Sequence, residues 1–543
     1  MKRGYTAHNS SQRALHSILR CPPGLWLRIR RFCISVQAHV TRGRTLRGVP
    51  RLFVLRKFFF LVCVLTVTFF VYLKWYFPSF LTSTMNRSNL EEFTQDWCRV
   101  RRVATDWELL RRPCKGNTKY GVDLHGWDRV NRTDPTQSFI PVMDIKPAGE
   151  FSRFSIQSQT SHGKPKTIGG DDWRVLIWGP TSFAPTVIDH ENGTYEVLFL
   201  VLEAGTYYAS IILDYSLCDG MKNPPDYWFM LGNIHGNGQP HGILLEPYVY
   251  LQRPLWEGIP LTITVPPPSG STRYEEFLNF GLENPSTCGL DCKLLWDGFG
   301  RWSSRTWKPH VPGLWMKRSP RNQEGVLWIY GDSNAGRFYR SIRQTDLCKT
   351  VFRGCALSYN WIYPIKNATL EKNQRNFLQI NITRILDALA NVIHSSHMND
   401  ANCVILLNHG LHFITSTNFS TYRAVIDGIV DLFKETATNE QGVEELTFRG
   451  KLIWKTNAGI HRERLEFPHH HKRRFLTRQR VQLYNAYATW AMCGAGFEVL
   501  DVYSLSASYP NGTDNRYNPF DSVHYKDSVF KPAEEILLQY FRP

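Results

Sequence analysis

Acidic residues are missing from the first 57 positions of the chain, which contain 13 lysines and arginines. This segment supplies most of the net charge of +17, because the remaining 486 residues carry only +4. A basic excess confined to one end argues against a folded nucleic-acid-binding surface, and we predict no nucleic-acid partner. A basic block directly before an apolar run instead indicates positive-inside membrane topology.

The apolar run at 58–73 has 16 uncharged residues, fewer than the ~20 that cross a bilayer of average thickness. Lys74 can extend the span by snorkelling, and Trp75 and Tyr76 can anchor it at the interface. We therefore predict an uncleaved signal-anchor at 58–73, a cytosolic tail at 1–57 and a lumenal C-terminus. The alternative is a cleaved signal peptide. It would need a basic region of 57 residues, and no small-x-small cleavage site follows.

Paired CxxC motifs are also absent, and we predict no metal site. An oxidising lumen would pair most of the nine cysteines beyond the span. Their odd number leaves one free or bonded to a second chain, and their spacing does not give the connectivity. The nine are Cys98, Cys114, Cys218, Cys288, Cys292, Cys348, Cys355, Cys403 and Cys493.

Seven Asn-x-Ser/Thr sequons lie beyond the span and are candidate glycosylation sites, which fits the same lumenal location. They are Asn86, Asn131, Asn192, Asn367, Asn381, Asn418 and Asn511.

The length of 543 residues predicts more than one domain. After a lumenal stalk at 74–140, short alternating runs at 174–178, 195–201 and 206–213 are typical of strands. Turn residues recur between them about every ten residues, which indicates an all-β sandwich. We place this sandwich at 141–270, because a proline run followed by Gly and Ser breaks the pattern at 265–271.

One stretch of the predicted sandwich is more specific. Residues 184–189, 191–197 and 204–209 read APTVID, ENGTYEV and AGTYYA. This stretch resembles the pattern of filamin-like, early-set immunoglobulin domains, in which D-x-x-x-G-x-Y-x-V leads to A-G-x-Y. The resemblance implies an immunoglobulin-like fold for this domain.

From about residue 285 the pattern changes to continuous apolar strands separated by amphipathic helices. This pattern predicts a parallel sheet covered on both faces, that is, a doubly wound α/β domain at 285–543. We expect strands at 325–330, 350–353, 403–407, 451–455 and 497–501. We expect helices at 334–345, 381–393, 421–436, 476–492 and 529–541.

Polar residues of catalytic type follow these strands. Ser333, in the sequence Gly-Asp-Ser, comes directly after the first strand and opens a helix. Asp521 and His524 are three residues apart, so that one turn can aim both side chains into one site. Asn408 follows the strand at 403–407, and Gly354 follows the one expected at 350–353; both could donate to an oxyanion. Each motif alone is more often an ordinary turn or cap.

Taken in order, these motifs resemble the SGNH (GDSL-like) hydrolase superfamily, and within it the PC-esterase branch. A Trp-rich segment at 296–309 precedes the nucleophile strand, as in that branch. With the anchor and sandwich, the chain resembles the neurexophilin and PC-esterase domain family.

The resemblance implies that Ser333 is the nucleophile, His524 the general base and Asp521 its orienting carboxylate. It implies oxyanion donation by Asn408 and Gly354. The third block of the superfamily usually reads G-x-N-D. Here it is Leu-Asn-His-Gly at 407–410, which keeps the asparagine and lacks the acid.

The resemblance implies an O-acetyltransferase or O-acetylesterase of the Golgi or another secretory membrane. The acceptor would be a glycan or glycoprotein, such as one bearing sialic acid. Acetyl-CoA or an acyl intermediate is the expected acyl donor, with no bound cofactor. The competing hypothesis is a catalytically inactive, secreted or cell-surface adhesion protein that binds a protein partner through its sandwich. The presence of Ser333, Asp521 and His524 together favours the enzyme.

Overall fold

The computed structural model describes residues 78–543, except for 123, 125, 230–249, 282–287, 289–291, 315, 365–379, 439, 465–472 and 516–517. The predicted tail and signal-anchor lie outside the described residues, as does Asn367. No helix within the described part of the chain is long and apolar enough to cross a membrane. Residues Asn86–Pro543 form one compact unit, separate from Met1–Met85.

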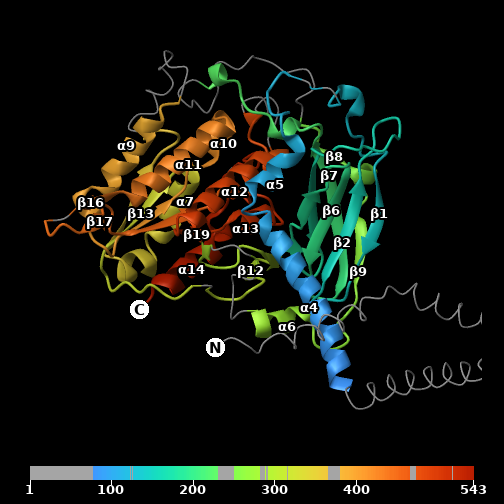
Figure 1. The fold of residues 1–543 in the computed structure, drawn as a ribbon, viewed down its shortest axis with the longest axis horizontal. Coiled ribbons are helices and arrows are strands. Elements are labelled where there is room, and N and C mark those ends of the chain that lie inside the picture. The colour runs from blue at the N-terminus through green and yellow to red at the C-terminus, as the bar shows by residue number, and fades with distance from the viewer. Residues whose placement is uncertain are drawn as a thin grey trace, which may run out of the picture. The chain divides into compact units, whose positions relative to one another are not determined.

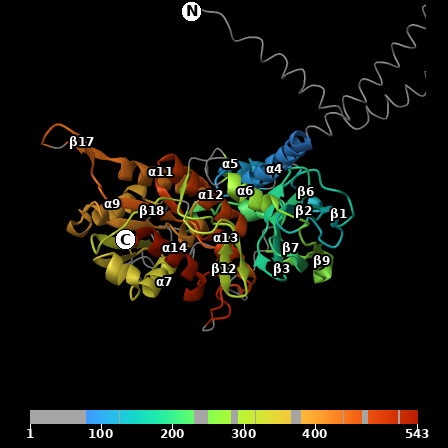
Figure 2. The same ribbon diagram turned by 90° about the horizontal axis from the view of Figure 1, so that it is seen from below.

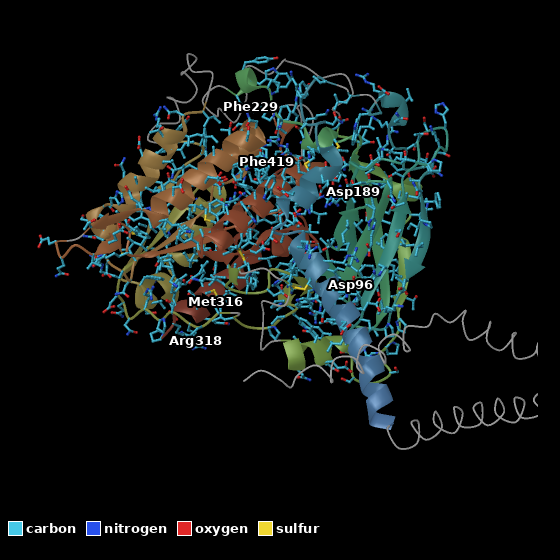
Figure 3. All side chains as sticks on the ribbon, in the orientation of Figure 1. Asp96, Asp189, Phe229, Met316, Arg318 and Phe419 are labelled. Carbon is cyan, nitrogen blue, oxygen red and sulfur yellow. A yellow bond between two sulfur atoms is a disulfide. The ribbon has the colours of Figure 1, made fainter. Side chains whose placement is uncertain are left out.

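Part of the predicted stalk belongs to the folded unit. Helix α4 (Pro78–Arg102) buries Phe93 and Trp97 in a cluster with Phe151 and Phe277. Asp96, labelled on α4 in Figure 3, forms ion pairs with Arg99 and with Arg153 of the sandwich. The chain then continues through α5 (Trp107–Arg111).

Antiparallel strands form two sheets between residues 139 and 309. The first has the order β1-β2-β6-β5, and the second the order β12-β11-β4-β3-β7-β8, with β9 also paired to β7. The predicted runs 174–178, 195–201 and 206–213 are confirmed as β3, β6 and β7. The first sheet contains β1 (Phe139–Asp144), β2 (Phe151–Gln157), β5 (Thr186–Asp189) and β6 (Thr194–Leu200). The second contains β3 (Asp172–Trp178), β4 (Ser182–Phe183), β7 (Gly205–Tyr215), β8 (Arg253–Pro254), β9 (Leu261–Val265), β11 (Gly300–Ser303) and β12 (Thr306–Pro309).

The core of these sheets contains aromatic and β-branched residues from the inward positions of each strand, among them Trp173, Val197 and Tyr207. The hairpin β11–β12 comes from beyond the proline-rich segment and α6 (Arg273–Gly281), yet Trp302 pairs with Ser182 of β4. The second sheet therefore extends past the predicted boundary at 270.

The C-terminal part contains a parallel sheet, six-stranded among the described residues, in the order β10-β19-β18-β15-β13-β14. All its pairs are parallel, as predicted. Its strands are β10 (Lys293–Leu294), β13 (Val326–Gly331), β14 (Gly354–Tyr359), β15 (Val404–Leu407), β18 (Lys451–Lys455) and β19 (Glu498–Leu500). Its helices are α7 (Ser333–Ile342), α9 (Ile382–Ile393), α10 (Leu411–Ser416), α11 (Phe419–Lys434), α12 (Arg478–Gly494), α13 (Tyr503–Ala507) and α14 (Lys531–Phe541).

Both faces of this sheet are covered by helices. Ile405 and Leu407 of β15 pack in one cluster with residues of α9, α11 and α12. Val404 and Leu406 pack in a second cluster with residues of α7 and α14. Alternate side chains of a strand point to opposite faces, so these two clusters show the doubly covered sheet that continuous apolar strands predict. Figures 1 and 2 show the helices on the two sides.

The strand predicted at 350–353 is wrong. Leu347–Val351 is a helical turn, and the strand is β14, which begins only at Gly354. Val351 and Phe352 are buried, and the Phe352 ring centroid lies 5.0 Å from that of Phe541 in α14. Their apolar, β-prone side chains therefore serve helix packing and not a sheet.

Four disulfides link the described cysteines: Cys98–Cys288, Cys114–Cys218, Cys292–Cys493 and Cys348–Cys355. Cys403 is free and fully buried. Disulfides in this number indicate an extracellular or lumenal location.

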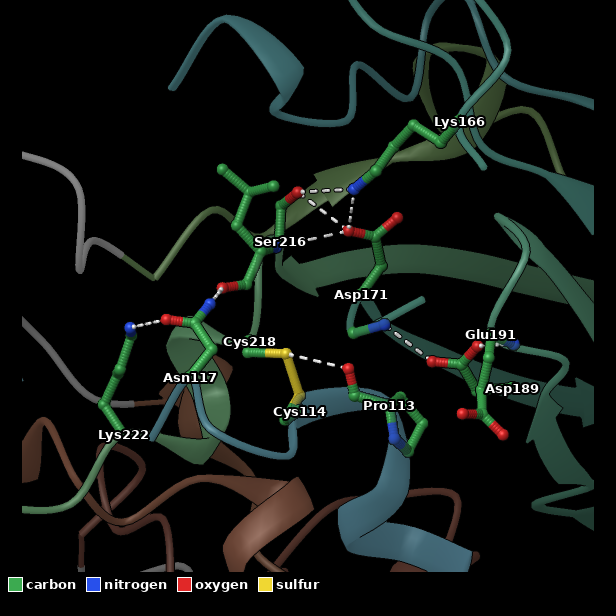
Figure 4. Close-up of a disulfide and its surroundings, with 12 residues drawn as sticks. Pro113, Cys114, Asn117, Lys166, Asp171, Asp189, Glu191, Ser216, Cys218 and Lys222 are labelled. Carbon is green, nitrogen blue, oxygen red and sulfur yellow. Dashed lines mark hydrogen bonds and ion pairs between the residues drawn. A yellow bond between two sulfur atoms is a disulfide. The ribbon is translucent and has the colours of Figure 1, made fainter. Parts of the chain in front are cut away.

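A buried polar network surrounds the Cys114–Cys218 disulfide (Figure 4). Lys166 Nζ lies 2.8 Å from Asp171 Oδ1, and the same oxygen accepts a hydrogen bond from Ser216 Oγ at 2.8 Å. Burial raises the pKa of Asp171, but the Lys166 charge and the hydroxyl donors outweigh it and lower this pKa below its usual value. This carboxylate is therefore held as an anion inside the protein.

Candidate active site

Ser333 is the first residue of α7 and stands just beyond the carboxyl end of β13. Asp332 caps the helix, because its Oδ1 accepts a hydrogen bond from the Asn334 backbone N–H at 2.9 Å. Backbone N–H groups in the first turn of a helix have no intrahelical acceptor, so the N–H of Ser333 is suited to an oxyanion. The side chain of Ser333 is half-buried.

The structure brings Ser333, His524 and Asp521 together. Ser333 Oγ lies 2.6 Å from His524 Nε2, and His524 Nδ1 lies 2.8 Å from Asp521 Oδ2. The carboxylate accepts a hydrogen bond from Nδ1–H. This interaction leaves the lone pair of Nε2 free to accept a hydrogen bond from the serine hydroxyl. The three groups thus have the connectivity of a nucleophile, a base and an orienting acid.

Asp521 is held as an anion by its hydrogen bonds. Burial raises its pKa, but the hydrogen bond and charge of His524 and the backbone N–H groups of Val523 and His524 outweigh burial and lower this pKa to about 2. Asn515 Nδ2 also donates to Asp521 Oδ2 at 3.0 Å. The carboxylate therefore stays charged at any physiological pH and can stabilise an imidazolium at His524.

Neighbouring segments fix the loop that contains Asp521 and His524. Thr513 Oγ1 donates to the Asp521 carbonyl at 2.8 Å, and the His461 backbone N–H donates to the Ser522 carbonyl at 2.9 Å. Arg473 Nη1 donates to Ser522 Oγ at 3.0 Å. The position of the base thus depends on loops that follow β18 and β19.

Asp332 joins the serine loop to the loop after β15. Its Oδ2 accepts a hydrogen bond from the Leu411 N–H at 3.2 Å, and the side chain is buried. A Cβ atom on Gly410 would lie 2.0 Å from this oxygen. Only glycine leaves room for the contact.

We expect Gly410→Ala to lower the free energy of unfolding by about 1–3 kcal/mol, because Asp332 must move. It should also slow reaction of Ser333 with an active-site probe. Denaturant unfolding and labelling rates measure both effects. Gly494→Ala is the matched control, because a Cβ there meets no atom within 4 Å. Equal behaviour of the two variants would contradict the role given to Asp332.

Asn408 lies beside the serine loop, but its amide points elsewhere. Its Nδ2 donates to the Lys455 carbonyl at 2.8 Å and to Asn457 Oδ1 at 3.3 Å. Its backbone N–H donates to the Tyr330 carbonyl at 2.9 Å. An oxyanion role for Asn408 therefore requires its side chain to exchange these partners.

Gly354 is not brought to Ser333. It opens β14 and pairs with Val326 at the start of β13, whereas Ser333 follows the end of β13. Gly354 thus lies at the amino-terminal end of the strands, whereas Ser333 lies at their carboxyl end. The prediction for Gly354 was wrong because the strand begins at this residue and does not end before it.

Asn360 occupies the place that was assigned to Gly354. It follows β14, is buried, and its backbone N–H donates to the Gly331 carbonyl at 2.7 Å. The signal in the sequence for Asn360 is its position as the polar residue directly after the strand at 354–359.

His409 directly follows Asn408 and does not contact Ser333, Asp521 or His524 among the described residues. Burial lowers the pKa of this imidazole to about 3, against a smaller opposing effect of Asp332, so the ring is neutral. It packs against Phe413, with ring centroids 4.7 Å apart. It therefore belongs to the core beside the site.

The described sequons differ in exposure. Asn192, Asn381 and Asn511 are exposed, whereas Asn131 and Asn418 are half-buried. Asn381 and Asn418 also cap α9 and α11 through their side chains. Asn86 lies in α4, and its side chain is outside the described part. Among the described residues, no group of three or more His, Cys, Asp or Glu side chains is arranged to hold a metal ion.

Comparison with known proteins gives no family for this chain. No protein-family model matches it. Among solved structures, the crystal structure of the Lin-41 filamin domain aligns with 15% of this chain and 82% of its own length, at 16% identity and a TM-score of 0.14. A score this low carries no argument about fold or activity.

Proposed function

We propose that this protein is a serine acyl-transfer enzyme of the secretory pathway, an O-acetyltransferase or O-acetylesterase acting on glycans such as those bearing sialic acid. The observation that supports it best is the 2.6 Å contact between Ser333 Oγ and His524 Nε2, with Asp521 on the other ring nitrogen. The proposal includes an SGNH-like fold for the C-terminal domain and an immunoglobulin-like fold for the sandwich. It also includes the membrane anchor at 58–73.

The reaction starts when His524 Nε2 takes the proton of Ser333 as Oγ attacks the acyl carbonyl. The tetrahedral intermediate collapses, the leaving group takes the proton from His524, and an acyl-serine remains. A sugar hydroxyl or water then attacks the acyl carbonyl with His524 as base, and Ser333 recovers its proton. The Ser333 N–H and, after a side-chain change, Asn408 or Asn360 would donate to the oxyanion.

Whether a sugar or water accepts the acyl group depends on the exclusion of water from the site. Two exposed aromatic residues lie next to the catalytic elements: Phe520 precedes Asp521 and is 46% exposed, and Tyr359 ends β14 and is 38% exposed. Aromatic rings at these positions can contact the C–H face of a sugar, which supports a glycan acceptor. Acetyl-CoA or an acyl intermediate derived from it is the proposed donor.

The four disulfides and the exposed sequons at Asn192, Asn381 and Asn511 support a lumenal or extracellular catalytic part. Within the proposal, the anchor retains this part in the Golgi or a neighbouring membrane.

The experiment is labelling with a fluorophosphonate, which reacts with activated serines. The wild type should be labelled, and Ser333→Ala should not. Ser341→Ala, on the same helix α7, is the control and should label like the wild type. Folded wild-type protein that is not labelled, or labelling that survives in Ser333→Ala, would refute the nucleophile.

A second candidate function is protein adhesion through the sandwich. Strand β1 lies at the edge of its sheet, and Phe139, Val142 and Met143 on it are 40%, 54% and 43% exposed. Exposed apolar edge strands favour pairing with a partner. An adhesion protein should be found shed or at the cell surface, whereas a resident enzyme should stay inside the cell.

A further inference from the structure

A cavity of about 320 Å³ lies between the sandwich and the α/β part, and Ser333 is not among its lining residues. Strands β3 and β5 form one wall, and α12 with the loops after β18 and β19 forms the other. These loops stand at the carboxyl edge of the parallel sheet, as Ser333 does. The volume lies within the range of small-molecule sites in proteins.

Most charged groups of the cavity wall are paired, and the two that form no ion pair among the described residues, Arg464 and Asp501, have opposite charges. Arg174 Nε lies 2.7 Å from Asp214, Arg478 pairs with Asp172, and Glu463 lies 3.0 Å from His461. A strongly charged ligand such as a phosphate would have to break these pairs. The charge balance therefore favours a neutral ligand.

Polar groups without partners also face this space. Asp501 is 8% exposed, and its Oδ1 accepts hydrogen bonds from Thr456 Oγ1 and the Tyr503 N–H, both at 2.9 Å. Its Oδ2 lies against Gly298, where a Cβ atom would be 2.4 Å from it. The side chains of Thr489, which is 4% exposed, and Gln482, both on α12, make no hydrogen bond among the described residues. Buried polar groups of this kind are normally satisfied, so a ligand or water must supply their partners.

Aromatic rings complete the wall, namely those of Phe299, Tyr503 and Tyr509. A wall that combines an amide and a hydroxyl group without protein partners with ring surfaces suits a molecule with many hydroxyls and apolar C–H faces. We propose that this cavity is a carbohydrate-binding site for one neutral pyranose unit, distinct from the proposed site at Ser333. The binding does not depend on Ser333 chemistry.

The cavity also adjoins the loop of Asp521 and His524. His461, which lines it, donates its backbone N–H to the Ser522 carbonyl, and Gly512, which also lines it, precedes the Thr513 that binds the Asp521 carbonyl. A sugar bound here would be held against two segments that position the base. The cavity would thus anchor a sugar of a longer glycan near the proposed catalytic centre.

The test uses full-length protein with Ser333→Ala, so that no turnover complicates binding. Saturation-transfer NMR and calorimetry measure binding of methyl glycosides of galactose, glucose and N-acetylgalactosamine, with N-acetylneuraminic acid as the charged comparison. We expect at least one neutral glycoside to bind. Thr489→Val and Gln482→Leu, which remove one polar group at similar volume, should weaken it about tenfold. Ala184→Phe, which fills the cavity, should abolish binding, and Thr489→Ser should bind normally.

Unchanged melting temperatures of Thr489→Val and Thr489→Ser verify that the fold is intact. No binding of any neutral glycoside at millimolar concentration, or binding that these cavity variants leave unchanged, would overturn the proposal. Preference for the charged sugar alone would overturn it as well. The same cavity variants are also made with Ser333 present and labelled with the fluorophosphonate. This labelling tests the proposed enzyme independently of sugar binding, so that either proposal can fail without the other.

Discussion

Asp521→Asn is expected to lower turnover of an activated acetyl ester about 10⁴-fold while leaving the fold intact. The asparagine amide N–H can donate a hydrogen bond to His524 Nδ1, whereas the carboxylate accepts a hydrogen bond from it at 2.8 Å. The imidazole would then carry its proton on Nε2, which faces Ser333 Oγ, and could not accept the serine proton. His524→Ala removes the base altogether and should cost at least as much, because triad members act as a unit.

The control for this series is Asp527→Asn, an acid on the same segment with no bond to His524 among the described residues. It should keep turnover within about twofold of the wild type, since exposed charges away from the site contribute little. The rates are best taken from the initial burst as well as from steady state, so that slow deacylation does not hide the first step. Comparable losses in Asp527→Asn and Asp521→Asn would argue against a specific role for the Asp521–His524 pair.

Lys166→Met is expected to destabilise the protein by about 3–5 kcal/mol, because it leaves the Asp171 carboxylate buried without its cation. The side chains of Lys166 and Asp171 are 2% and 0% exposed. Thr133 and Ser216 still donate to the carboxylate, but hydroxyl dipoles do not replace a full charge. Denaturant unfolding with the disulfides intact measures the loss.

Lys146→Met is the matched control, because Lys146 pairs with an acid at a similar distance but on the surface of the protein. Lys146 Nζ lies 2.9 Å from Asp144, with side chains 47% and 43% exposed, and its loss should cost about 0–1 kcal/mol. The double variant Lys166→Met, Asp171→Leu should recover part of the loss, because no charge then remains buried. A loss in Lys166→Met no larger than in Lys146→Met would show that the Asp171 carboxyl is neutral in the folded protein.

The parts of the fold that the sequence predicted are those in which one local pattern decides the structure. The run at 403–407 is apolar at every position, because β15 is covered on both faces, and it could be read as a buried parallel strand. The burial of β3 alternates because one face meets the sandwich core, and its β-branched and aromatic residues are typical of a strand. Five helices of the C-terminal part, α7, α9, α11, α12 and α14, were predicted to within a few residues from their amphipathic pattern, whereas the short helices α10 and α13 were not predicted.

The parts of the fold that the sequence did not predict depend on contacts between residues that are far apart in the chain. Phe352 is apolar because it packs against Phe541, which no local pattern reveals, so β14 was misplaced and Asn360 was overlooked. The hairpin β11–β12 has strands of four residues and joins the sandwich through Trp302 and Ser182. The cavity combines residues of β3 with residues of α12 and the loop after β19, which lie hundreds of positions further along the chain.

The candidate site contains residues that local motifs predict and residues whose orientation depends on distant contacts. Ser333 and the Asp521–His524 pair could be predicted because the first motif directly follows a strand and the second precedes the last helix, although the serine and the histidine are 191 positions apart. The direction of the Asn408 amide could not be named, because it depends on the Lys455 carbonyl and Asn457 on the neighbouring strand end.

The central claim is that Ser333 becomes acylated. Full-length protein is mixed with an activated acetyl ester, quenched with acid within milliseconds to seconds, digested and analysed by mass spectrometry. We predict that one acetyl group appears on the peptide that contains Ser333, rises as a burst and disappears when a sugar acceptor or time for hydrolysis is given. In Asp521→Asn the acetyl group should form far more slowly, and in Ser333→Ala not at all. Absence of acetyl-Ser333 in folded wild-type protein, or an equal yield of acetylation elsewhere in Ser333→Ala, would contradict the account.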